Sequence, residues 1–286
     1  MHYVNSKSIL STKNGMNLYR GCSHGCIYCD SRSEVYNMNH GFEDIEVKQN
    51  SVELLKKELI KRDKAMIGTG AMTDPYIPAE KQLKYLRKSL ELILRYGFGF
   101  TCITKSDLVL RDLDLLKKIN DKSKAVVQMT LTTADDELCR ILEPNVCTTS
   151  RRVEVLKRLN DENIPTVVWL CPILPYINDG KQNISEILDY CIESNVKGVL
   201  CFKMGLTLRK GNREYFYKKL DQHFPNLKNR YIKEYGNSYS LDSPNNKKLM
   251  KLFYTKTDSA GILNRPSDIF EYLQEFPQDS IQSKLI

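Results

Sequence analysis

Three cysteines lie within eight positions of the sequence, in the segment GCSHGCIYCD (residues 21–30). They are Cys22, Cys26 and Cys29, in a C-x3-C-x2-C spacing. Closely spaced cysteine thiolates hold iron–sulfur clusters, and a four-iron cluster has four iron corners to ligate. Three local thiolates therefore leave one corner free for a ligand other than these side chains.

Zinc is the alternative that this spacing has to be weighed against. A structural zinc site takes four ligands, and the nearest fourth candidate, His24, lies between the cysteines, where its ring can hardly turn back to the same metal. Catalytic zinc uses three protein ligands, but rarely all from one eight-residue loop. We therefore expect an iron–sulfur cluster at this loop.

The elements that must position the cysteines follow a regular order along the chain. Short apolar runs bounded by glycine, proline or charge predict buried strands at residues 65–69, 98–104, 125–131, 166–174 and 198–204. A first strand is expected at residues 17–19, just before the cysteines. Apolar stripes predict helices at residues 51–61, 81–96, 150–159 and 183–194.

This alternation of strands and helices implies parallel strands joined by right-handed crossovers. Six strands are too few for the usual eight-stranded closure, so the sequence predicts an α/β fold with a partial (β/α)6 TIM-type barrel. The barrel is expected to occupy residues 1–205, with the cysteine loop at 21–30. Residues 206–286 are basic and aromatic without a strand rhythm, and we expect them to form a C-terminal helical cap packed on the barrel.

Composition limits the classes of function. The 43 lysines and arginines against 35 acidic residues give a net charge of +8, which favours a polyanionic partner such as nucleic acid. No apolar run approaches the roughly 20 residues that cross a bilayer, and the first residues lack the apolar block of a secretion signal. We expect a cytoplasmic monomer without a membrane partner, whose nine cysteines are thiols or metal ligands.

The cysteine spacing, followed by a barrel of about six strands, resembles the radical S-adenosylmethionine (SAM) superfamily. Two segments, NLYRGCSHGCIYCD (17–30) and GTGAMTDPYIPAE (68–80), are similar to the spore photoproduct lyase and DNA repair photolyase branch. The resemblance runs from residue 17 to 205 and continues faintly to the C-terminus. It implies a 4Fe-4S cluster on the three cysteines, with SAM bound at the open iron. One-electron cleavage of SAM would yield a 5′-deoxyadenosyl radical that abstracts hydrogen from the substrate. An external electron donor of flavodoxin or ferredoxin type is implied as well.

The resemblance also assigns residues to cofactor binding. In chain order they are Tyr28, Gly68, Thr69, Gly70, Thr73, Asp74, Lys105 and Thr130. Tyr28 matches the aromatic that packs on adenine, and the glycines let the backbone approach the methionine amino group. Lys105 resembles a lysine near the cofactor carboxylate or ribose, and Thr130 a hydroxyl that bonds the ribose. Structural alternatives remain: Asp74 as a turn cap, Thr130 as a buried threonine bonded to backbone, and Lys105 as a solvated strand end.

The match fails where hydrogen is returned to the product. In spore photoproduct lyases a cysteine shortly after the second strand donates this hydrogen, and a tyrosine following the last cluster cysteine relays it. Here residues 71–73 read AMT, and Asp30 follows the last cysteine. Candidate substitutes are Cys171 and Cys201, on the fifth and sixth predicted strands, and Tyr76. A cysteine within a strand is more often a small core residue than a reactive one.

Three functions are therefore compatible with the sequence. The first is a radical SAM enzyme acting on DNA or RNA, with a lyase or repair reaction on a pyrimidine lesion. The second is a radical SAM enzyme for a peptide or small metabolite, since the usual hydrogen-donor cysteine and tyrosine are absent. The third is a non-catalytic iron–sulfur or zinc protein, which would form no 5′-deoxyadenosine from SAM. Salt-sensitive binding to oligonucleotides separates the first from the second.

Two further features have both a functional and a structural interpretation. The segment 228–239, with Arg230, Tyr231, Lys233 and Tyr235, could grip phosphates and stack a displaced base. Alternatively, it is a helix with a solvated charged face and tyrosines on the core. In the segment LEPNVCTTSRR, Glu143 and Arg151 are expected to form a salt bridge that holds the loop.

Overall fold

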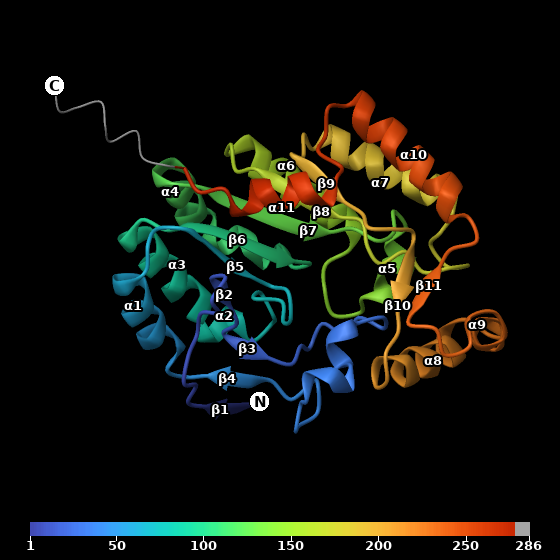
Figure 1. Cartoon of the computed structure of the whole chain (residues 1–286), viewed down its shortest axis with the longest axis horizontal. Helices are drawn as coiled ribbons and strands as arrows, with labels where there is room; N and C mark the ends of the chain where they lie inside the picture. Colours follow the sequence, from blue (N-terminus) through green and yellow to red (C-terminus); the bar gives the residue numbers. More distant parts are fainter. Residues whose placement is uncertain (278–286) are drawn as a thin grey trace.

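A six-stranded parallel sheet lies at the centre of the computed structural model, which describes residues 1–277 (Figure 1). Its order, β2-β5-β6-β7-β8-β9, follows the order of the chain, and every neighbouring pair is parallel. The strands are β2 (Gly15–Met16), β5 (Met66–Thr69), β6 (Gly99–Thr104), β7 (Ala125–Thr130), β8 (Thr166–Trp169) and β9 (Gly198–Leu200). The predicted partial TIM-type barrel is confirmed.

Helices connect these strands and cover the sheet. They are α1 (Ser51–Lys61), α2 (Glu80–Leu83), α3 (Tyr85–Tyr96), α4 (Leu113–Lys122), α5 (Asp136–Leu142), α6 (Thr149–Asp161) and α7 (Lys181–Glu193), with short 3-10 turns at Asp30–Arg32, Glu34–Tyr36 and Asp107–Asp112. The single helix expected at 81–96 is interrupted at Lys84, whose φ is 55°. Helices α4 and α5 were not predicted. Within residues 1–277, no helix combines the length and apolar character that crossing a membrane requires.

The start of the chain departs from the prediction. The barrel strand β2 ends at Met16, whereas β3 (Tyr19–Arg20) belongs to a separate three-stranded sheet of order β1-β4-β3. There β3 runs antiparallel to β4 (Glu46–Lys48), and β1 (His2–Val4) runs parallel to β4. The strand expected at 17–19 is therefore two shorter strands in two sheets, and the second leads directly into the cysteine loop.

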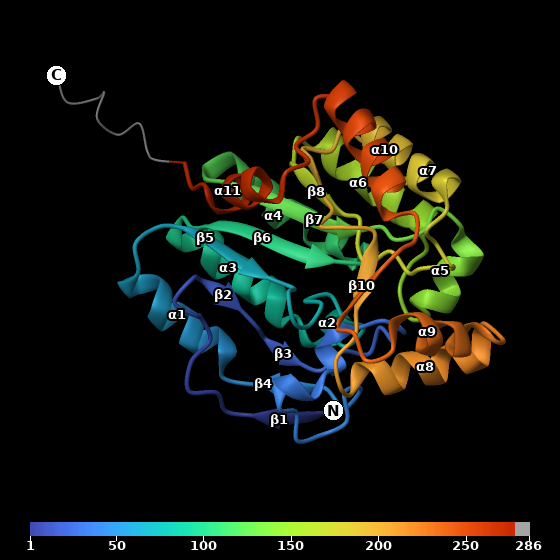
Figure 2. The same ribbon diagram turned by 45° about the vertical axis from the view of Figure 1, so that its right-hand side comes forward.

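The segment from residue 205 to residue 277 adds four helices and two strands, of which β10, α8 and α9 lie near the carboxyl ends of the barrel strands (Figure 2). It contains β10 (Gly205–Thr207), α8 (Asn212–His223), α9 (Leu227–Tyr235), β11 (Ser240–Asp242), α10 (Asn246–Ser259) and α11 (Pro266–Gln274). Strands β10 and β11 pair antiparallel, α10 packs on α7, and α11 packs on β9. Phe216, Leu220 and Tyr231 from α8 and α9 share one apolar cluster with Ile27 and Tyr28 of the cysteine loop. The division at residue 205 stays a prediction, and β11 shows that the second part is not entirely helical.

Candidate active site at the cysteine loop

The path of the cysteine loop is fixed by neighbouring backbone. Gly21 has φ +85°, and a Cβ there would lie 2.6 Å from the carbonyl oxygen of Phe42, so only glycine permits this approach. The amide of Cys22 donates to the same carbonyl at 2.9 Å. The amide of Ile27 donates to the carbonyl of Leu142 at 2.9 Å. Segments on both sides of the loop therefore position its three cysteines.

The three thiols are free and spread apart. Cys22 and Cys26 are buried, and Cys29 is partly exposed. Among residues 1–277, the three sulfur atoms do not form a group whose members all lie within 4.8 Å of one another. A single zinc ion with Zn–S bonds of about 2.3 Å would hold its thiolates about 3.8 Å apart. A four-iron cluster does not require so close an approach, because each thiolate binds a different iron. Burial raises the pKa of the Cys26 and Cys29 thiols, and the charge of Lys105 acts in the opposite direction.

A buried ion pair lies beneath the loop. The guanidinium of Arg152 on α6 is fully buried and contacts Oε2 of Glu143 at 2.5 Å. The hydroxyl of Tyr28 donates to Oε1 of the same carboxylate. Arg152 also donates to the carbonyl of Thr130 at 3.1 Å. Burial alone would raise the pKa of Glu143, but the charges of Arg152 and Lys105 outweigh it and lower that pKa, so the carboxylate stays ionised.

The expected salt bridge between Glu143 and Arg151 is wrong. Arg151 lies at the surface, where it contacts Asp107 at 3.0 Å and Glu154 at 2.7 Å. The partner of Glu143 is the next residue, Arg152. Successive helical residues point about 100° apart, so only one of two adjacent arginines can face the loop. The sequence pattern does not say which.

The carboxylate oxygens of Asp74 accept hydrogen bonds from neighbouring protein groups. It accepts from the hydroxyl of Thr104 and from the amides of Lys105 and Tyr76, each at 2.8 Å. Nδ1 of His24 lies 3.4 Å from Oδ2 of Asp74. His24 stands between Cys22 and Cys26 in the cysteine loop. Burial disfavours a charge on His24, but Asp74 outweighs this effect and raises the pKa of His24 to about 10. Asp74 thus takes the turn-capping role, and fastens the cysteine loop to the end of β6.

A cavity of about 550 Å³ opens beside Cys29 at the carboxyl ends of the strands. In barrels of this type ligands bind at that edge. The sequence-predicted residues that line the cavity are Tyr28, Cys29, Gly70, Lys105, Thr130 and Cys171. Gly70 has φ +100°, and a Cβ there would lie 2.2 Å from the carbonyl oxygen of Ile103. The wall at this point can therefore be formed only by glycine.

Lys105, Tyr28 and Thr130 give the cavity a charge, an aromatic face and a hydroxyl. Burial opposes the charge on Lys105, but the nearby Cys26 and Glu143 outweigh it and raise the pKa of the amine. The amine lies 6.0 Å from the centre of the Tyr28 ring. A lysine that stays charged beside an aromatic ring suits a nucleoside carrying a carboxylate, as SAM does.

The other residues assigned to the cofactor line different cavities. Gly68 and Thr69 line a smaller cavity of about 220 Å³, which shares Ala71 and Ile103 with the larger one. Thr73 lines a third cavity of about 370 Å³ on the side of the three-stranded sheet. Cofactor contacts by these three residues stay predictions.

Cys171 is the one hydrogen-donor candidate of the three that lines the 550 Å³ cavity. It follows β8 instead of lying within it, and burial raises its pKa to about 12, so it is a protonated thiol at neutral pH. Cys201 follows β9 and is fully buried, with its sulfur 3.8 Å from that of Met250. Tyr76 is also fully buried, with the guanidinium of Arg111 5.9 Å from its ring centre. Neither side chain reaches the cavity, so the structure does not support either as a hydrogen donor.

Two aromatic side chains at this cavity were missed by sequence analysis. The indole nitrogen of Trp169 donates to Oε1 of Gln128 at 2.7 Å, and Gln128 donates to the hydroxyl of Thr101 at 2.7 Å. Phe202 is 55% exposed and stacks on Phe270 with ring centres 6.3 Å apart. The sequence offered one signal for the position of Trp169. Gln128 lies in a largely apolar predicted strand, and a buried amide needs a polar partner.

Helix α9 buries Tyr231 in the core and leaves Tyr235 partly exposed. Tyr231 is fully buried and donates to the carbonyl of Pro175 at 2.7 Å. Tyr235 donates to the carbonyl of Asp242 at 2.8 Å. The base-stacking interpretation of this helix is therefore wrong for Tyr231, and the alternative of a tyrosine on the core is confirmed for that residue.

Comparison with known families agrees with this geometry. The sequence model of the Radical SAM superfamily matches residues 16–191, which is more than half of the chain. The chain therefore belongs to the radical SAM superfamily. Its cofactors are those of the family, a 4Fe-4S cluster and SAM.

Its relatives in sequence include two proteins that are named as uncharacterized. The uncharacterized protein Rv2578c of Mycobacterium tuberculosis is 28% identical over 242 residues, covering 82% of this chain and 71% of the relative. The uncharacterized protein MJ0683 of Methanocaldococcus jannaschii is 32% identical over 185 residues, covering 64% of this chain and 69% of the relative.

Among solved structures, spore photoproduct lyase complexed with dinucleoside spore photoproduct has a TM-score of 0.65 at 14% identity, covering 92% of this chain and 80% of the lyase. A variant of that lyase with bound AdoMet and the same dinucleoside has a TM-score of 0.62 at 14% identity, covering 88% of this chain and 75% of the variant. At this identity the likeness shows the shared fold.

Proposed function

We propose that this protein is a radical SAM enzyme that acts on a damaged pyrimidine in nucleic acid, with a lyase-type reaction. One observation carries the proposal: a single cavity combines Cys29 of the cluster loop, the thiol of Cys171, and the aromatic side chains of Trp169 and Phe202. When bound, the cluster and SAM supply a 5′-deoxyadenosyl radical that abstracts hydrogen. The fold shared with spore photoproduct lyase supports the same choice of substrate class.

The chain's own residues divide into two groups around the cavity. Tyr28, Lys105 and Thr130 form the part that suits the adenosyl and carboxylate groups of SAM, through stacking, charge and hydrogen bonding. Trp169 and Phe202 form the part that suits a flat base. A base inside a duplex cannot reach such a cavity, so the substrate nucleotide has to leave the stack, and aromatic faces stabilise it there.

Hydrogen return is the role we propose for Cys171. After hydrogen abstraction and bond cleavage, the substrate radical takes the hydrogen atom of the Cys171 S–H bond. The sulfur-centred radical that remains takes one electron from the external reductant and one proton from solvent, which restores the S–H bond, and 5′-deoxyadenosine leaves with the hydrogen taken from the substrate. This step needs a thiol and not a thiolate, and the pKa of about 12 keeps the proton on the sulfur.

The substrate class can be tested with the anaerobically reconstituted, reduced protein. We expect dinucleoside spore photoproduct to be converted to thymine only when SAM and the reductant are both present, and the undamaged dinucleoside to remain unchanged. Cleavage of SAM to 5′-deoxyadenosine with the lesion left intact would point to a peptide or small metabolite instead. Failure to cleave SAM under all conditions would contradict radical chemistry altogether.

The role of Cys171 can be tested by running the same reaction in D2O. The thiol exchanges its hydrogen with solvent, so the product of the wild-type reaction should carry deuterium. Cys171→Ala should still cleave SAM but incorporate at least about tenfold less solvent deuterium into the product. Cys201→Ala is the matched control and should label its product like the wild type. Loss of label in Cys201→Ala, with label retained in Cys171→Ala, would overturn the assignment.

A further inference from the structure

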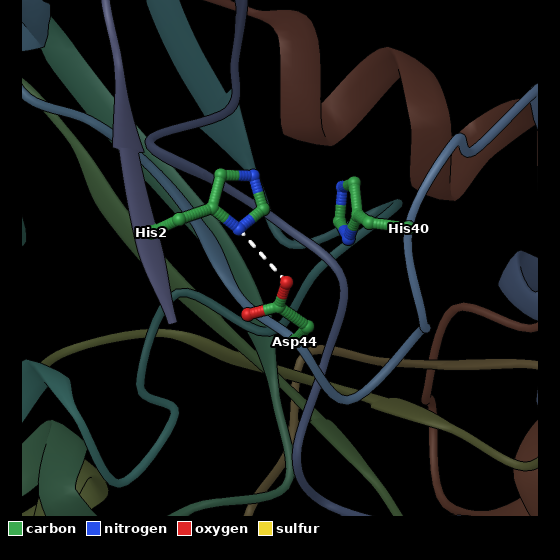
Figure 3. A group of neighbouring side chains, drawn as sticks. All are labelled: His2, His40 and Asp44. Atoms are coloured by element: carbon green, nitrogen blue, oxygen red, sulfur yellow. Dashed lines mark hydrogen bonds and ion pairs between the residues drawn. The ribbon is translucent and has the colours of Figure 1, made fainter.

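A second group of side chains that could hold a metal ion comes from outside the cysteine loop (Figure 3). His2 belongs to β1, and His40 and Asp44 belong to the loop that precedes β4. One possible ligand atom from each lies within 4.8 Å of the other two. Nδ1 of His2 is 2.9 Å from Oδ2 of Asp44, and the two imidazole rings meet edge to face with centres 4.8 Å apart. Two imidazoles and a carboxylate thus converge from positions 42 residues apart.

The hydrogen bonding of His40 prepares one of its nitrogens as a ligand. Nδ1 of His40 lies 3.0 Å from the carbonyl oxygen of Gly41. Because a carbonyl can only accept, Nδ1 carries the hydrogen, and the lone pair of the neutral ring is on Nε2. Nε2 is buried and has no hydrogen-bond partner among the described residues. Metal-bound histidines characteristically donate their other ring N–H to a carbonyl in this way. A buried nitrogen without a partner is otherwise unfavourable.

We propose that His2, His40 and Asp44 bind a divalent transition-metal ion. Zinc is the ion used in the experiment below. Imidazole nitrogens and a carboxylate oxygen are ligands that zinc accepts, at about 2.0–2.2 Å. Such bonds place ligand atoms about 3.4 Å apart. Nδ1 of His2 and Oδ2 of Asp44 are 2.9 Å apart, and one ligand atom of each of the three residues lies within 4.8 Å of the other two, so small side-chain shifts reach this geometry. Nothing in the cysteine loop contributes to this site.

Two charged groups lie beside these three residues, the carboxylate of Glu46 and the amino group of Met1. Glu46 is paired with His2 in the register of β1 and β4, and its Oε2 lies 3.8 Å from Nε2 of His40. Glu46 is not part of the group of three, and its carboxylate would have to move toward His2 and Asp44 to become a fourth ligand. The amino group of Met1 contacts Oδ1 of Asp44 at 2.6 Å, which leaves Oδ2 for the metal.

Metal at this position would act on the cluster loop through backbone. Phe42 lies between His40 and Asp44, and its carbonyl accepts the amide of Cys22 at 2.9 Å. The same carbonyl is the atom that excludes a side chain at Gly21. Fixing both ends of this short loop to β1 would therefore hold the segment that shapes the start of the cysteine loop.

The experiment uses the full chain with its cluster intact, purified without a polyhistidine tag. Equilibrium dialysis against zinc, with zinc and iron measured together, should show one additional zinc per chain and unchanged iron. His40→Ala should weaken zinc binding at least about tenfold. His223→Ala, on α8, is the matched control and should bind zinc like the wild type. Zinc should raise the midpoint of thermal unfolding of the wild type and His223→Ala, but not of His40→Ala.

His2→Ala provides a second variant in case His40→Ala does not fold, and it should lose zinc to a similar extent. The proposal is overturned if the cluster-loaded protein takes up no zinc. It is also overturned if zinc binds equally well to His40→Ala and His223→Ala, or if zinc enters only as iron is lost, since the cysteines would then be the ligands.

Discussion

Gly70 is a residue of the site where the surrounding backbone leaves no room for a side chain. Gly70 combines φ +100° with a Cβ position 2.2 Å from the carbonyl oxygen and 2.7 Å from the amide nitrogen of Ile103. Gly70→Ala is expected to lower the free energy of unfolding by about 2 kcal/mol or more, because it adds backbone strain to an overpacked contact. Anaerobic urea titration followed by circular dichroism measures the change.

Gly41→Ala is the matched control for this prediction. Gly41 has nothing within 4 Å of the position a Cβ would take, and its φ is not in the left-handed region. Its substitution should change stability by less than about 0.5 kcal/mol. If both alanine variants unfold at the same urea concentration, the close approach of β5 and β6 at Gly70 is not present in solution.

At the scale of elements, one buried ion pair connects α6 to the cysteine loop. Arg152→Met leaves the carboxylate of Glu143 buried without its main partner, and should cost about 3–5 kcal/mol of stability. Arg151→Met removes an exposed arginine from the adjacent position, and should cost less than about 1 kcal/mol. The same urea titrations, with iron content as a second readout, measure both variants.

The double variant Glu143→Gln/Arg152→Met separates charge from packing. Because no unpaired charge then remains between these two positions, it should be more stable than Arg152→Met alone. A double variant that is less stable than Arg152→Met would show that lost packing, and not the buried charge, dominates the effect.

How far the elements could be predicted depends on their length and burial. Strands β5 to β9 are almost entirely buried, and buried parallel strands are short apolar runs that a sequence shows directly. Strands of two or three residues, such as β1, β3 and β4, are too short to show a repeating pattern of apolar residues. The ends were misjudged where apolar residues continue past a strand. The run 166–174 placed Cys171 inside a strand, but β8 ends at Trp169 and leaves this thiol at the cavity.

The candidate site was predictable only in its local part. The spacing of the cluster cysteines is a property of ten consecutive residues and needs no tertiary information. The pairing of Glu143 with Arg152, and the meeting of Trp169 with Phe202, depend on how separate elements pack. Adjacent arginines and isolated aromatics carry no sequence signal that distinguishes the surface from the cavity.

At the scale of the whole molecule, the net charge of +8 and the exposed Phe202 predict two separable contributions to nucleic-acid binding. Phosphate contacts release counterions, so the logarithm of the affinity for a single-stranded oligonucleotide should fall linearly with the logarithm of salt concentration. Stacking of a base on an aromatic ring releases no counterions. Phe202→Ala should therefore weaken binding about 5- to 150-fold at every salt concentration, from about 1–3 kcal/mol per stacked base, without changing the slope.

Fluorescence anisotropy with a labelled single-stranded oligonucleotide measures both terms, and Tyr254→Ala supplies the comparison. Tyr254 is a 40% exposed aromatic on α10 and does not line the cavity beside Cys29. Its loss should leave affinity and slope unchanged. If Phe202→Ala and Tyr254→Ala bind alike, the aromatic side chains at the cavity do not stack a base. If affinity does not vary with salt, the positive charge of the molecule is not directed at phosphates, and a peptide or small metabolite becomes the better substrate class.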